Sequence, residues 1–321
     1  MAALTSPGDW MFGIQLPIQT LTRTLVDPWE DSASVDDLVR IATAADGLGY
    51  GFVGVCDHVV IPDNEYAANM TTTWYDTVST LSFLAAHTER ARLLSVVWVA
   101  AYRHPLQTAK AFGTLDHLSG GRAILGVGAG HVEAEFEALG IDFTTRGRQL
   151  DETLEAVRGA FADTYVSHDG DFFSYADVGV GPQPVQAELP IWVGGAGKAA
   201  WRRTGRIGDG YIPMGLPKEQ YPEAISLMRE AAEAAGRPAD VPLDIGYMPP
   251  WGYLLGDAPD DGSIGLHWLQ GGVEGLAADI RAAREAGANV MHCKFRARDA
   301  EEYVDSLAAF TELVVPLVEE G

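Results

Sequence analysis

The sequence predicts an α/β protein, a TIM (β/α)8 barrel formed by residues 1–321 as a single domain, with insertions after strands 4 and 7. Apolar segments alternate with helical patterns along the whole chain, and no linker-like change in composition divides it. A chain of 321 residues with 47% hydrophobic residues is also large enough to bury one barrel-sized core. The eight segments expected to be strands are Phe12–Leu16, Gly51–Val55, Leu93–Val99, Ala123–Val127, Ile191–Val193, Gly210–Pro213, Leu243–Tyr247 and Asn289–Lys294.

Helix signals follow most of these strands. Ser34, with an acid three residues later, is typical of an N-cap, and an apolar stripe then runs to Leu48 before Gly49. Pro105 suits the first position of a helix that ends near Ser119, and we expect the preceding His104 to be structural. These helices are expected to cover the outside of the barrel.

Two connections are too long for plain barrel loops. The segment from Gly128 to Pro190 includes a helix and a hairpin expected over Tyr165–Tyr175, with its turn at 168–170. The segment from Met248 to Gly272 carries Trp251, Tyr253 and Trp268 among glycines and acids. A loop of that length after the seventh strand is more often a lid or a substrate wall than filler.

Composition excludes several classes of function. Twenty-two Lys and Arg against 45 Asp and Glu give a net charge of −23, which repels nucleic acid and anionic membrane surfaces. The start of the chain lacks the basic and apolar regions of an export signal, and its two cysteines lie far apart. No apolar stretch is long enough for a membrane helix, and no metal-ligand spacing appears. We therefore expect a cytoplasmic protein that acts on a small molecule.

The fifth expected strand ends on glycines and opens directly into a cationic helix. The turn consists of Gly194, Gly195, Ala196, Gly197 and Lys198, with Arg202 and Arg203 in the helix. Glycines allow close approach of a ligand, and a helix start offers unpaired N–H groups, so the turn suits a phosphate. The alternative is an ordinary strand-to-helix turn in which the glycines serve geometry alone.

Candidate chemical groups follow two other strands. Asp57 and His58 come after the second strand, where a barrel opens to its active face. His58 is the expected general acid/base, and Asp57 either fixes its tautomer or bonds a cofactor. The fourth strand ends in Gly128, Ala129 and Gly130, which would let a flat ligand lie against the main chain. The next residue, His131, projects into that site or is simply solvated.

Several segments together resemble the bacterial luciferase-like superfamily, whose barrel enzymes use reduced flavin or the deazaflavin coenzyme F420. The resemblance spans about residues 12 to 213 and rests on the order and spacing of weak motifs. They are residues 44–50, Asp57-His58, Tyr102-Arg103-His104-Pro105, residues 115–122, residues 125–130, Arg146-Gly147 with Asp151-Glu152, Pro182-Gln183-Pro184, Gly194-Gly195 and Gly208-Asp209-Gly210.

The resemblance implies a role for each matching residue. His58 matches the catalytic or proton-handling histidine, and Asp57 matches an acid at the polar edge of the cofactor. A non-proline cis peptide that supports the cofactor ring falls at Val96 and Val97. The phosphate site falls on Gly194, Gly195, Ala196, Gly197 and Lys198. The resemblance also implies a homodimer.

The choice of cofactor favours F420 over FMN. Ala129 stands where bacterial luciferase places an arginine that reaches the flavin phosphate. The residues of the motifs around Arg103 and Arg122 resemble those of the deazaflavin-dependent branch more closely. The leading expectation is hydride transfer between F420 and an organic substrate. The alternatives are an FMN-dependent monooxygenase, a sugar-phosphate barrel and a non-catalytic flavin-binding protein.

Overall fold

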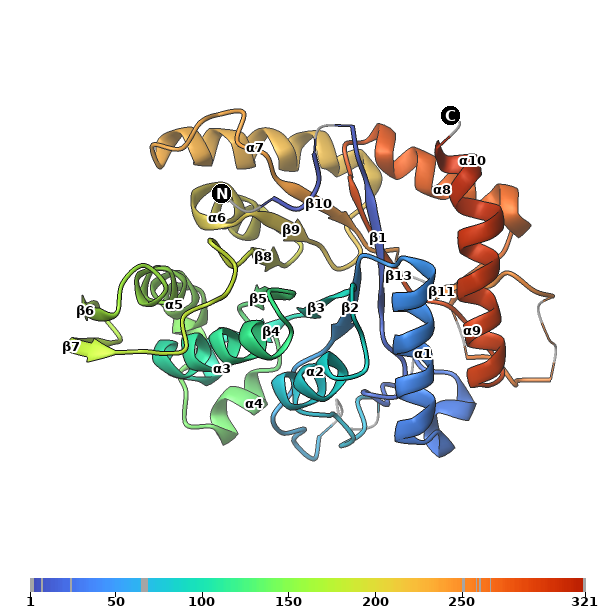
Figure 1. The fold of residues 1–321 in the computed structure, drawn as a ribbon, viewed down its shortest axis with the longest axis horizontal. Helices are drawn as coiled ribbons and strands as arrows, with labels where there is room; N and C mark the ends of the chain where they lie inside the picture. The colour runs from blue at the N-terminus through green and yellow to red at the C-terminus, as the bar shows by residue number, and fades with distance from the viewer. Residues whose placement is uncertain are drawn as a thin grey trace.

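The described residues form a closed barrel of parallel strands, as the sequence predicts. The computed structural model describes residues 3–6, 8–23, 25–64, 69–249, 252–257, 259, 261–265 and 267–319. The barrel closes by pairing of the third and fourth of its eight strands (Figure 1). These strands are β1 (Met11–Gln15), β2 (Phe52–Val55), β3 (Arg92–Ser95), β5 (Ala123–Gly128), β8 (Ile191–Gly194), β9 (Gly210–Ile212), β10 (Asp244–Tyr247) and β13 (Val290–Cys293).

The third expected strand is interrupted. Residues 93–99 were expected to form one continuous strand, but β3 ends at Ser95 and the short β4 (Trp98–Val99) begins after a cis peptide bond between Val96 and Val97. The expectation of continuity was wrong because apolar residues on both sides of the break look the same in sequence. The cis bond itself lies where the family resemblance implies it.

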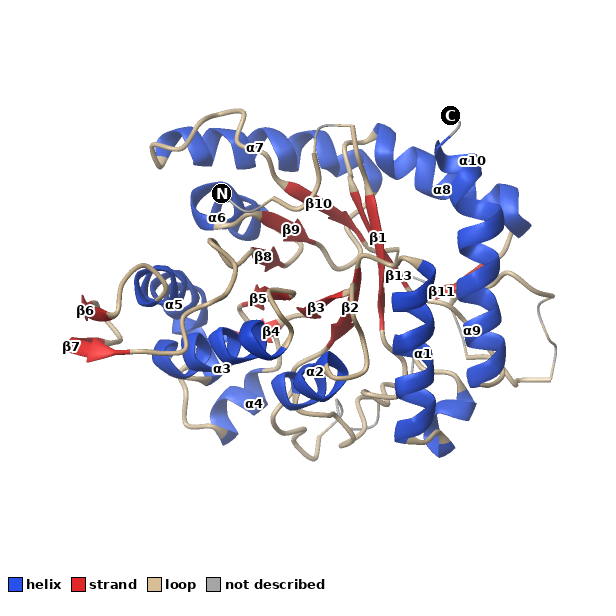
Figure 2. Cartoon of the chain, viewed as in Figure 1, coloured by secondary structure: helices blue, strands red, loops and turns tan. Residues whose placement is uncertain are grey.

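Helices surround the barrel and bury their apolar faces against it (Figure 2). They are α1 (Val35–Leu48), α2 (Thr77–Ala85), α3 (Pro105–Leu118), α5 (Arg146–Ala160), α6 (Lys198–Ile207), α7 (Tyr221–Ala234), α8 (Gly272–Glu285), α9 (Ala300–Ala309) and α10 (Val315–Glu319). Ser34 caps α1 through a capping box with Asp37, and Gly49 ends it in the left-handed conformation. His104 caps α3 with its ring, so its structural role is confirmed. No described helix is both long enough and apolar enough to cross a bilayer.

Side chains close the end of the barrel opposite the expected site. Phe52, Leu94, Ile124 and Trp192 form a buried cluster inside it. Below them the buried Asp244 carboxylate accepts hydrogen bonds from the backbone of the N-terminal segment and from the indole of Trp192. Burial raises the pKa of Asp244. The interior is therefore packed rather than hollow, and ligands are confined to the other end.

Both expected insertions are present. The first holds α4 (Glu133–Ala138), a 3-10 turn at Phe143–Thr145, and an antiparallel hairpin of β6 (Tyr165–Asp169) and β7 (Ser174–Gly179). The turn lies at residues 170–173 and the hairpin runs to Gly179, so the expected turn at 168–170 and end at Tyr175 were wrong, because residues 168 and 169 still pair with β7. The second holds β11 (Gly252–Tyr253) and β12 (Trp268–Leu269), which pair in parallel, whereas Trp251 lies outside the described residues. Residues 16–34 and 56–76 are two further long connections that the sequence analysis did not single out.

The second insertion is tied to the loop after β1. Asp27, which is 1% exposed, accepts the Gly265 N–H at 2.7 Å and the Ala297 N–H at 2.9 Å. The Arg296 guanidinium lies 3.2 Å from the same carboxylate and also donates to the Leu25 carbonyl at 3.0 Å. A buried ion pair of this kind, with further bonds to both loops, favours a fixed wall over a freely swinging lid.

Asp46, near the end of α1, binds the backbone of the residues that lead into β3. Its carboxylate accepts the N–H groups of Glu89, Arg90 and Ala91 at 3.0, 2.8 and 2.6 Å. Burial opposes ionisation, but these bonds outweigh it and lower the pKa of Asp46. A depressed folded-state pKa stabilises the protein above about pH 4, and this stabilisation is lost as pH falls through the folded pKa.

We predict that Asp46→Asn lowers the free energy of unfolding by roughly 1–3 kcal/mol at pH 7, because the amide nitrogen meets an N–H donor. The difference from wild type should shrink on acidification below about pH 4. Urea unfolding at pH 7, 5 and 3.5 measures it, with the exposed Asp305→Asn as the control. A difference that is constant with pH would contradict the prediction.

Helices α6 and α7 cross at a glycine. A Cβ on Gly205 would lie 1.9 Å from the Met228 carbonyl oxygen, which belongs to the backbone of α7. We predict that Gly205→Ala costs about 1–3 kcal/mol of stability, since the helices must separate. Gly159→Ala in α5 is the control, because its Cβ meets nothing within 4 Å and should stabilise by roughly 0.5–1 kcal/mol. Denaturant unfolding shows whether each variant loses or gains free energy of unfolding.

Candidate active site

The barrel is open at the C-terminal ends of its strands. The inward-facing residues at the middle of the barrel, such as Phe52 and Leu94, are fully buried. At the strand ends, however, Val96, Val97 and Lys294 are partly accessible to solvent. Side chains that face the inside of a closed barrel can meet solvent only through an open end. This end therefore offers the space where a ligand could bind.

Two valines form the floor of this opening. The Val96 and Val97 side chains lean over glycines of three strands: a Cβ on Gly54 would lie 2.6 Å from Val96, and Cβ atoms on Gly128 and Gly194 would lie 2.4 and 2.7 Å from Val97. These glycines thus have a packing reason to be glycine, which the sequence analysis did not foresee. Contact of Gly128 and Gly194 with a cofactor stays a prediction.

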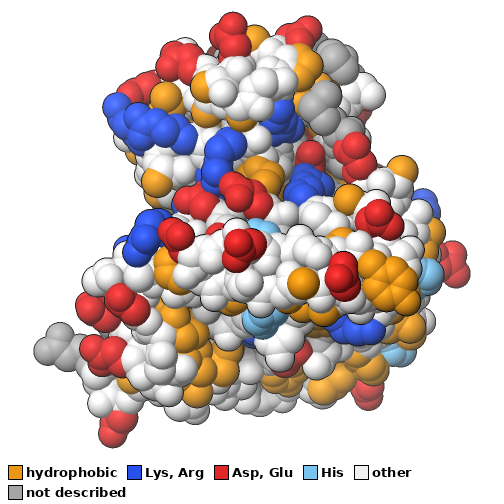
Figure 3. Space-filling view, turned by 90° about the vertical axis from the view of Figure 1, so that its left-hand side faces the viewer, with side chains coloured by type: hydrophobic (Ala, Val, Ile, Leu, Met, Phe, Trp, Pro, Cys, Tyr) orange, Lys and Arg blue, Asp and Glu red, His pale blue; other side chains and the backbone are white. Residues whose placement is uncertain are grey.

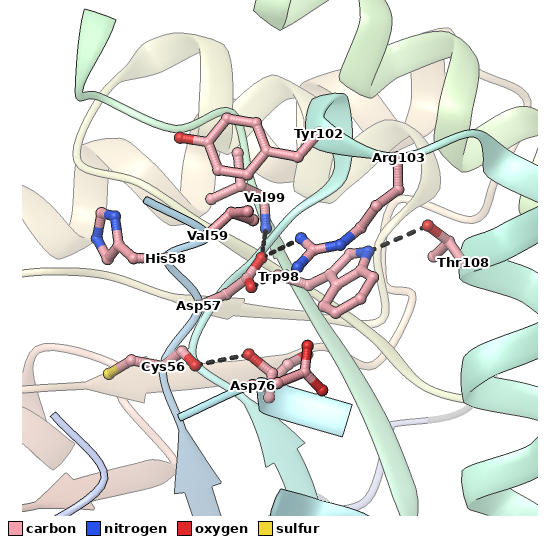
Figure 4. A network of polar contacts seen from close by, with 12 residues as sticks. Cys56, Asp57, His58, Val59, Asp76, Trp98, Val99, Tyr102, Arg103 and Thr108 are labelled. Atoms are coloured by element: carbon pink, nitrogen blue, oxygen red, sulfur yellow. Dashed lines mark hydrogen bonds and ion pairs between the residues drawn. The ribbon is translucent and has the colours of Figure 1, made fainter. Parts of the chain in front are cut away.

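His58 is held by Glu135 rather than by Asp57. The Nδ1 atom of His58 lies 2.8 Å from Oε2 of Glu135, a buried residue of α4 in the first insertion. Figure 4 shows the imidazole turned away from Asp57. The alternative that Asp57 fixes the tautomer of His58 was therefore wrong, because Asp57 faces the other side of the loop. The His58 side chain is 10% exposed.

The Glu135 carboxylate collects several donors. Besides His58, the Tyr102 hydroxyl donates to it at 2.7 Å and the Val59 and Val60 N–H groups at 2.6 and 3.1 Å. Burial by itself would raise the pKa of Glu135, but the bonds from His58, Tyr102 and Val59 lower it overall. Burial and the bond to Glu135 raise the pKa of Tyr102, so this phenol stays protonated. An ionised Glu135 accepts only, which places the proton of neutral His58 on Nδ1 and leaves Nε2 as the base.

Asp57 is engaged in a second ion pair. Its buried carboxylate accepts the Val99 N–H at 2.8 Å and two bonds from Arg103 at 2.5 and 2.8 Å (Figure 4). The Arg103 guanidinium stacks 3.5 Å above the ring of the buried Trp98. Asp57 thus anchors β4 just after the valine floor, and its expected contact with a cofactor stays a prediction.

Aromatic rings enclose His58. The Trp74 ring centroid lies 4.4 Å from that of His58, and the His131 centroid lies 5.8 Å away nearly at a right angle. Partial burial and the nearby His58 lower the pKa of His131, although the side chain reaches solvent. Of the two alternatives for His131, its position beside His58 favours the site. Gly130 has φ +80°, and a Cβ there would lie 2.7 Å from Phe136.

The glycine turn after β8 has the expected strand-turn-helix form. Gly195 and Ala196 are exposed, Gly195 has φ +130°, and α6 begins at Lys198 after Gly197. The Tyr211 hydroxyl donates to the Gly195 carbonyl at 2.7 Å and so holds the turn in place. No side chain larger than a methyl group stands between the strand and the helix. The turn is therefore shaped to admit a group that bonds to backbone amides.

Two of the three cations near this turn, Lys198 and Arg203, are already paired, and Arg202 is exposed. Arg203 is buried and binds Asp151 of α5 at 2.7 Å, so the expectation that it adds charge to the turn was wrong. A helical residue five positions past the start of α6 points into the protein, which the sequence alone did not reveal. Lys198 is exposed and pairs with Glu223 at 2.8 Å. Carboxylates are distributed widely over the visible face of the molecule, in keeping with the net charge (Figure 3).

Sequence reasoning missed Glu135 and Tyr102. Tyr102 stands inside a motif that was quoted for the resemblance, and Glu135 lies four residues after His131 beside the apolar Phe136. An acid in an apolar helical stripe was the available signal, because such an acid is buried and needs donors. Within the described ranges, no group of three or more His, Cys, Asp or Glu side chains is arranged to hold a metal ion.

Comparison with known proteins agrees with this architecture. An uncharacterised protein of Mycobacterium tuberculosis is 32% identical over 224 residues, which cover 65% of this chain and 79% of that protein. An F420-dependent glucose-6-phosphate dehydrogenase of Microbacterium testaceum is 30% identical over 213 residues, covering 64% and 61% of the two chains. The solved structure of the monooxygenase RslO1 from Streptomyces bottropensis superimposes with a TM-score of 0.74 at 25% identity, covering 95% and 99%.

The match to a family profile is broader than either of these two pairwise sequence matches. The profile of the luciferase-like monooxygenases aligns with residues 11–260, which include seven of the eight barrel strands and both sides of the site. The chain therefore belongs to the luciferase-like monooxygenase family.

Proposed function

We propose that this protein is an oxidoreductase that transfers a hydride between the deazaflavin F420 and an organic substrate, with His58 as the general acid/base. The observation that carries the proposal is the bond between His58 Nδ1 and the buried Glu135, which leaves Nε2 as the exchanging atom. An imidazole in a fixed tautomer can take a proton from a substrate hydroxyl as the hydride leaves, and return it in reverse.

The residues at the opening fit a deazaflavin. The valine floor of Val96 and Val97 offers an apolar surface on which a ring could lie. The turn from Gly195 to Lys198 offers backbone amides for a phosphate-bearing tail. When bound, the deazaflavin would supply the hydride-accepting and hydride-donating carbon. The chain's own part is to orient the ring, to position the substrate and to move the proton at His58.

The F420-dependent relatives and Ala129 favour the deazaflavin, while the likeness to RslO1 favours the second candidate, an FMN-dependent monooxygenase. Titration of the apoprotein with F420 and with FMN, followed by absorbance and fluorescence at micromolar protein, decides between them. We expect saturable binding of F420 and weaker binding of FMN. Tight FMN binding with oxygen consumption by the reduced complex would favour the monooxygenase instead.

The role of His58 is tested separately. His58→Asn should retain F420 binding but lose turnover by about 10²–10⁴-fold, the usual contribution of a general acid/base. The exposed His117→Asn in α3 is the matched control and should change neither quantity. Unchanged turnover in His58→Asn would favour a non-catalytic binding protein.

A further inference from the structure

Lys294 places a cation in the barrel opening. It follows β13, in which Val290 belongs to the buried interior cluster and the His292 ring lies 5.6 Å from Phe52. Alternate residues of an extended strand face the same side, so Lys294 faces the interior as well. It lies above His292, at the open end, and is partly accessible to solvent. A ligand in the opening could therefore reach its ammonium group.

Lys294 has no direct partner in the part of the chain that the structure describes. It forms no hydrogen bond and no ion pair with another described residue. Glu30 and Asp27 act on its charge from a distance, but both are engaged elsewhere: Glu30 accepts the Ile18 and Asp27 N–H groups at 2.8 Å each, and Asp27 pairs with Arg296. Burial lowers the pKa of Lys294, and an anion beside it would oppose that effect.

Other polar groups face the same space. Gln15 of β1 lies beside Lys294 by the register of β1 with β13, and its amide donates to the Cys56 thiol at 3.1 Å. One step deeper, His292 is 1% exposed, and neither of its ring nitrogens has a hydrogen-bond partner within the described part of the chain. A buried polar group without a partner is costly, so this side of the opening favours a ligand that brings polar groups rather than a purely apolar one.

We propose that Lys294 binds a carboxylate group of the organic substrate, which makes the substrate a carboxylate-bearing alcohol or carbonyl compound. This inference rests on the proposed function, since it concerns the molecule that reacts beside His58. By the register of β13, β1 and β2, Lys294 is level with Gly54 of β2, two strand spacings or roughly 10 Å away, and His58 follows four residues after Gly54. The carboxylate therefore stands several bonds from the reacting carbon.

The negative net charge of the protein makes Lys294 decisive for the binding of an anionic substrate. A net charge of −23 disfavours anions, so a substrate with a carboxylate needs a local, uncompensated cation to enter. Lys294 offers three N–H donors to one anionic group. A neutral substrate would leave the ammonium group without an acceptor.

Matched ligand pairs test the proposal. Calorimetry would compare 4-oxopentanoate with its primary amide, and benzoate with benzamide, on wild type, Lys294→Met, Lys294→Arg and the exposed control Lys110→Met. We expect wild type to bind each carboxylate about 10- to 100-fold more tightly than its amide, as a charged hydrogen bond allows. Lys294→Met should abolish this preference, Lys294→Arg should retain it, and Lys110→Met should leave it unchanged.

Equal affinity for carboxylate and amide in wild type would overturn the proposal, even if Lys294→Met does not fold. A full preference retained by a folded Lys294→Met would overturn it too. F420 titration of the same proteins keeps the two hypotheses apart. Normal F420 binding without a carboxylate preference refutes the carboxylate site alone, whereas a Lys294-dependent preference without F420 binding refutes the proposed cofactor alone.

Discussion

Glu135→Gln is expected to reverse the tautomer of His58. In the wild type one carboxylate oxygen accepts from the Val59 and Val60 amides and the other from His58 and Tyr102. Glutamine has one acceptor oxygen, which must face the two backbone N–H groups because these cannot reverse. Its NH2 group then donates to Nδ1 of His58, so the ring proton moves to Nε2 and the base is lost.

The consequence for activity should be large. We expect turnover of Glu135→Gln to fall by about 10²–10⁴-fold, approaching His58→Asn, with F420 binding retained. Nitrogen-15 NMR of labelled histidine reads the tautomer directly. Glu137→Gln, an exposed acid of the same helix, is the control and should leave both spectrum and rate unchanged. An Nδ1–H tautomer persisting in Glu135→Gln would contradict this assignment.

Asp57→Ala is expected to destabilise the protein more than any other single change considered above. The Asp57 side chain is 2% exposed and the Arg103 side chain 16%, so the variant leaves a largely buried guanidinium without its carboxylate. The Val99 N–H also loses its acceptor. Removal of one partner of a buried pair costs about 3–5 kcal/mol.

A double-mutant cycle with Arg103→Ala isolates the pair. We expect the loss of unfolding free energy in the double variant to be smaller than the sum of the two single losses by at least about 1 kcal/mol, because the unpaired charge is removed. Urea unfolding measures each variant, and Asp305→Ala on the exposed face of α9 is the control. Additive losses would show that Asp57 and Arg103 act independently.

The two acids near His58 show where sequence reasoning reaches its limit. Asp57 is adjacent to His58 in the chain and therefore drew the expectation of a partnership, yet successive residues at a strand end face different sides. Glu135 is 77 positions away and still lies within hydrogen-bond distance of Nδ1. Adjacency in sequence says little about side-chain direction once a strand has ended.

Local patterns determined much of this protein. The positions of the barrel strands, the cap at Ser34, the existence of the hairpin and the glycine turn follow from short-range chemistry, because each depends on residues within one turn or one strand. The break in the third strand and the exact turn of the hairpin did not follow from it. The cis bond lies where the family motifs implied it. The placement of His58 at the open end of the barrel also followed from its position after the second strand.

Tertiary structure alone decided which groups meet. The pairing of His58 with Glu135, the commitment of Asp57 to Arg103, and the solitary charge of Lys294 depend on which strand ends and insertions face each other across the opening. Closure of the barrel brings β13 beside β1 and an insertion helix over β2, so distances between these side chains are set by packing and not by spacing along the chain. Hydrogen bonding and burial at those contacts then determine the environment of each of these side chains.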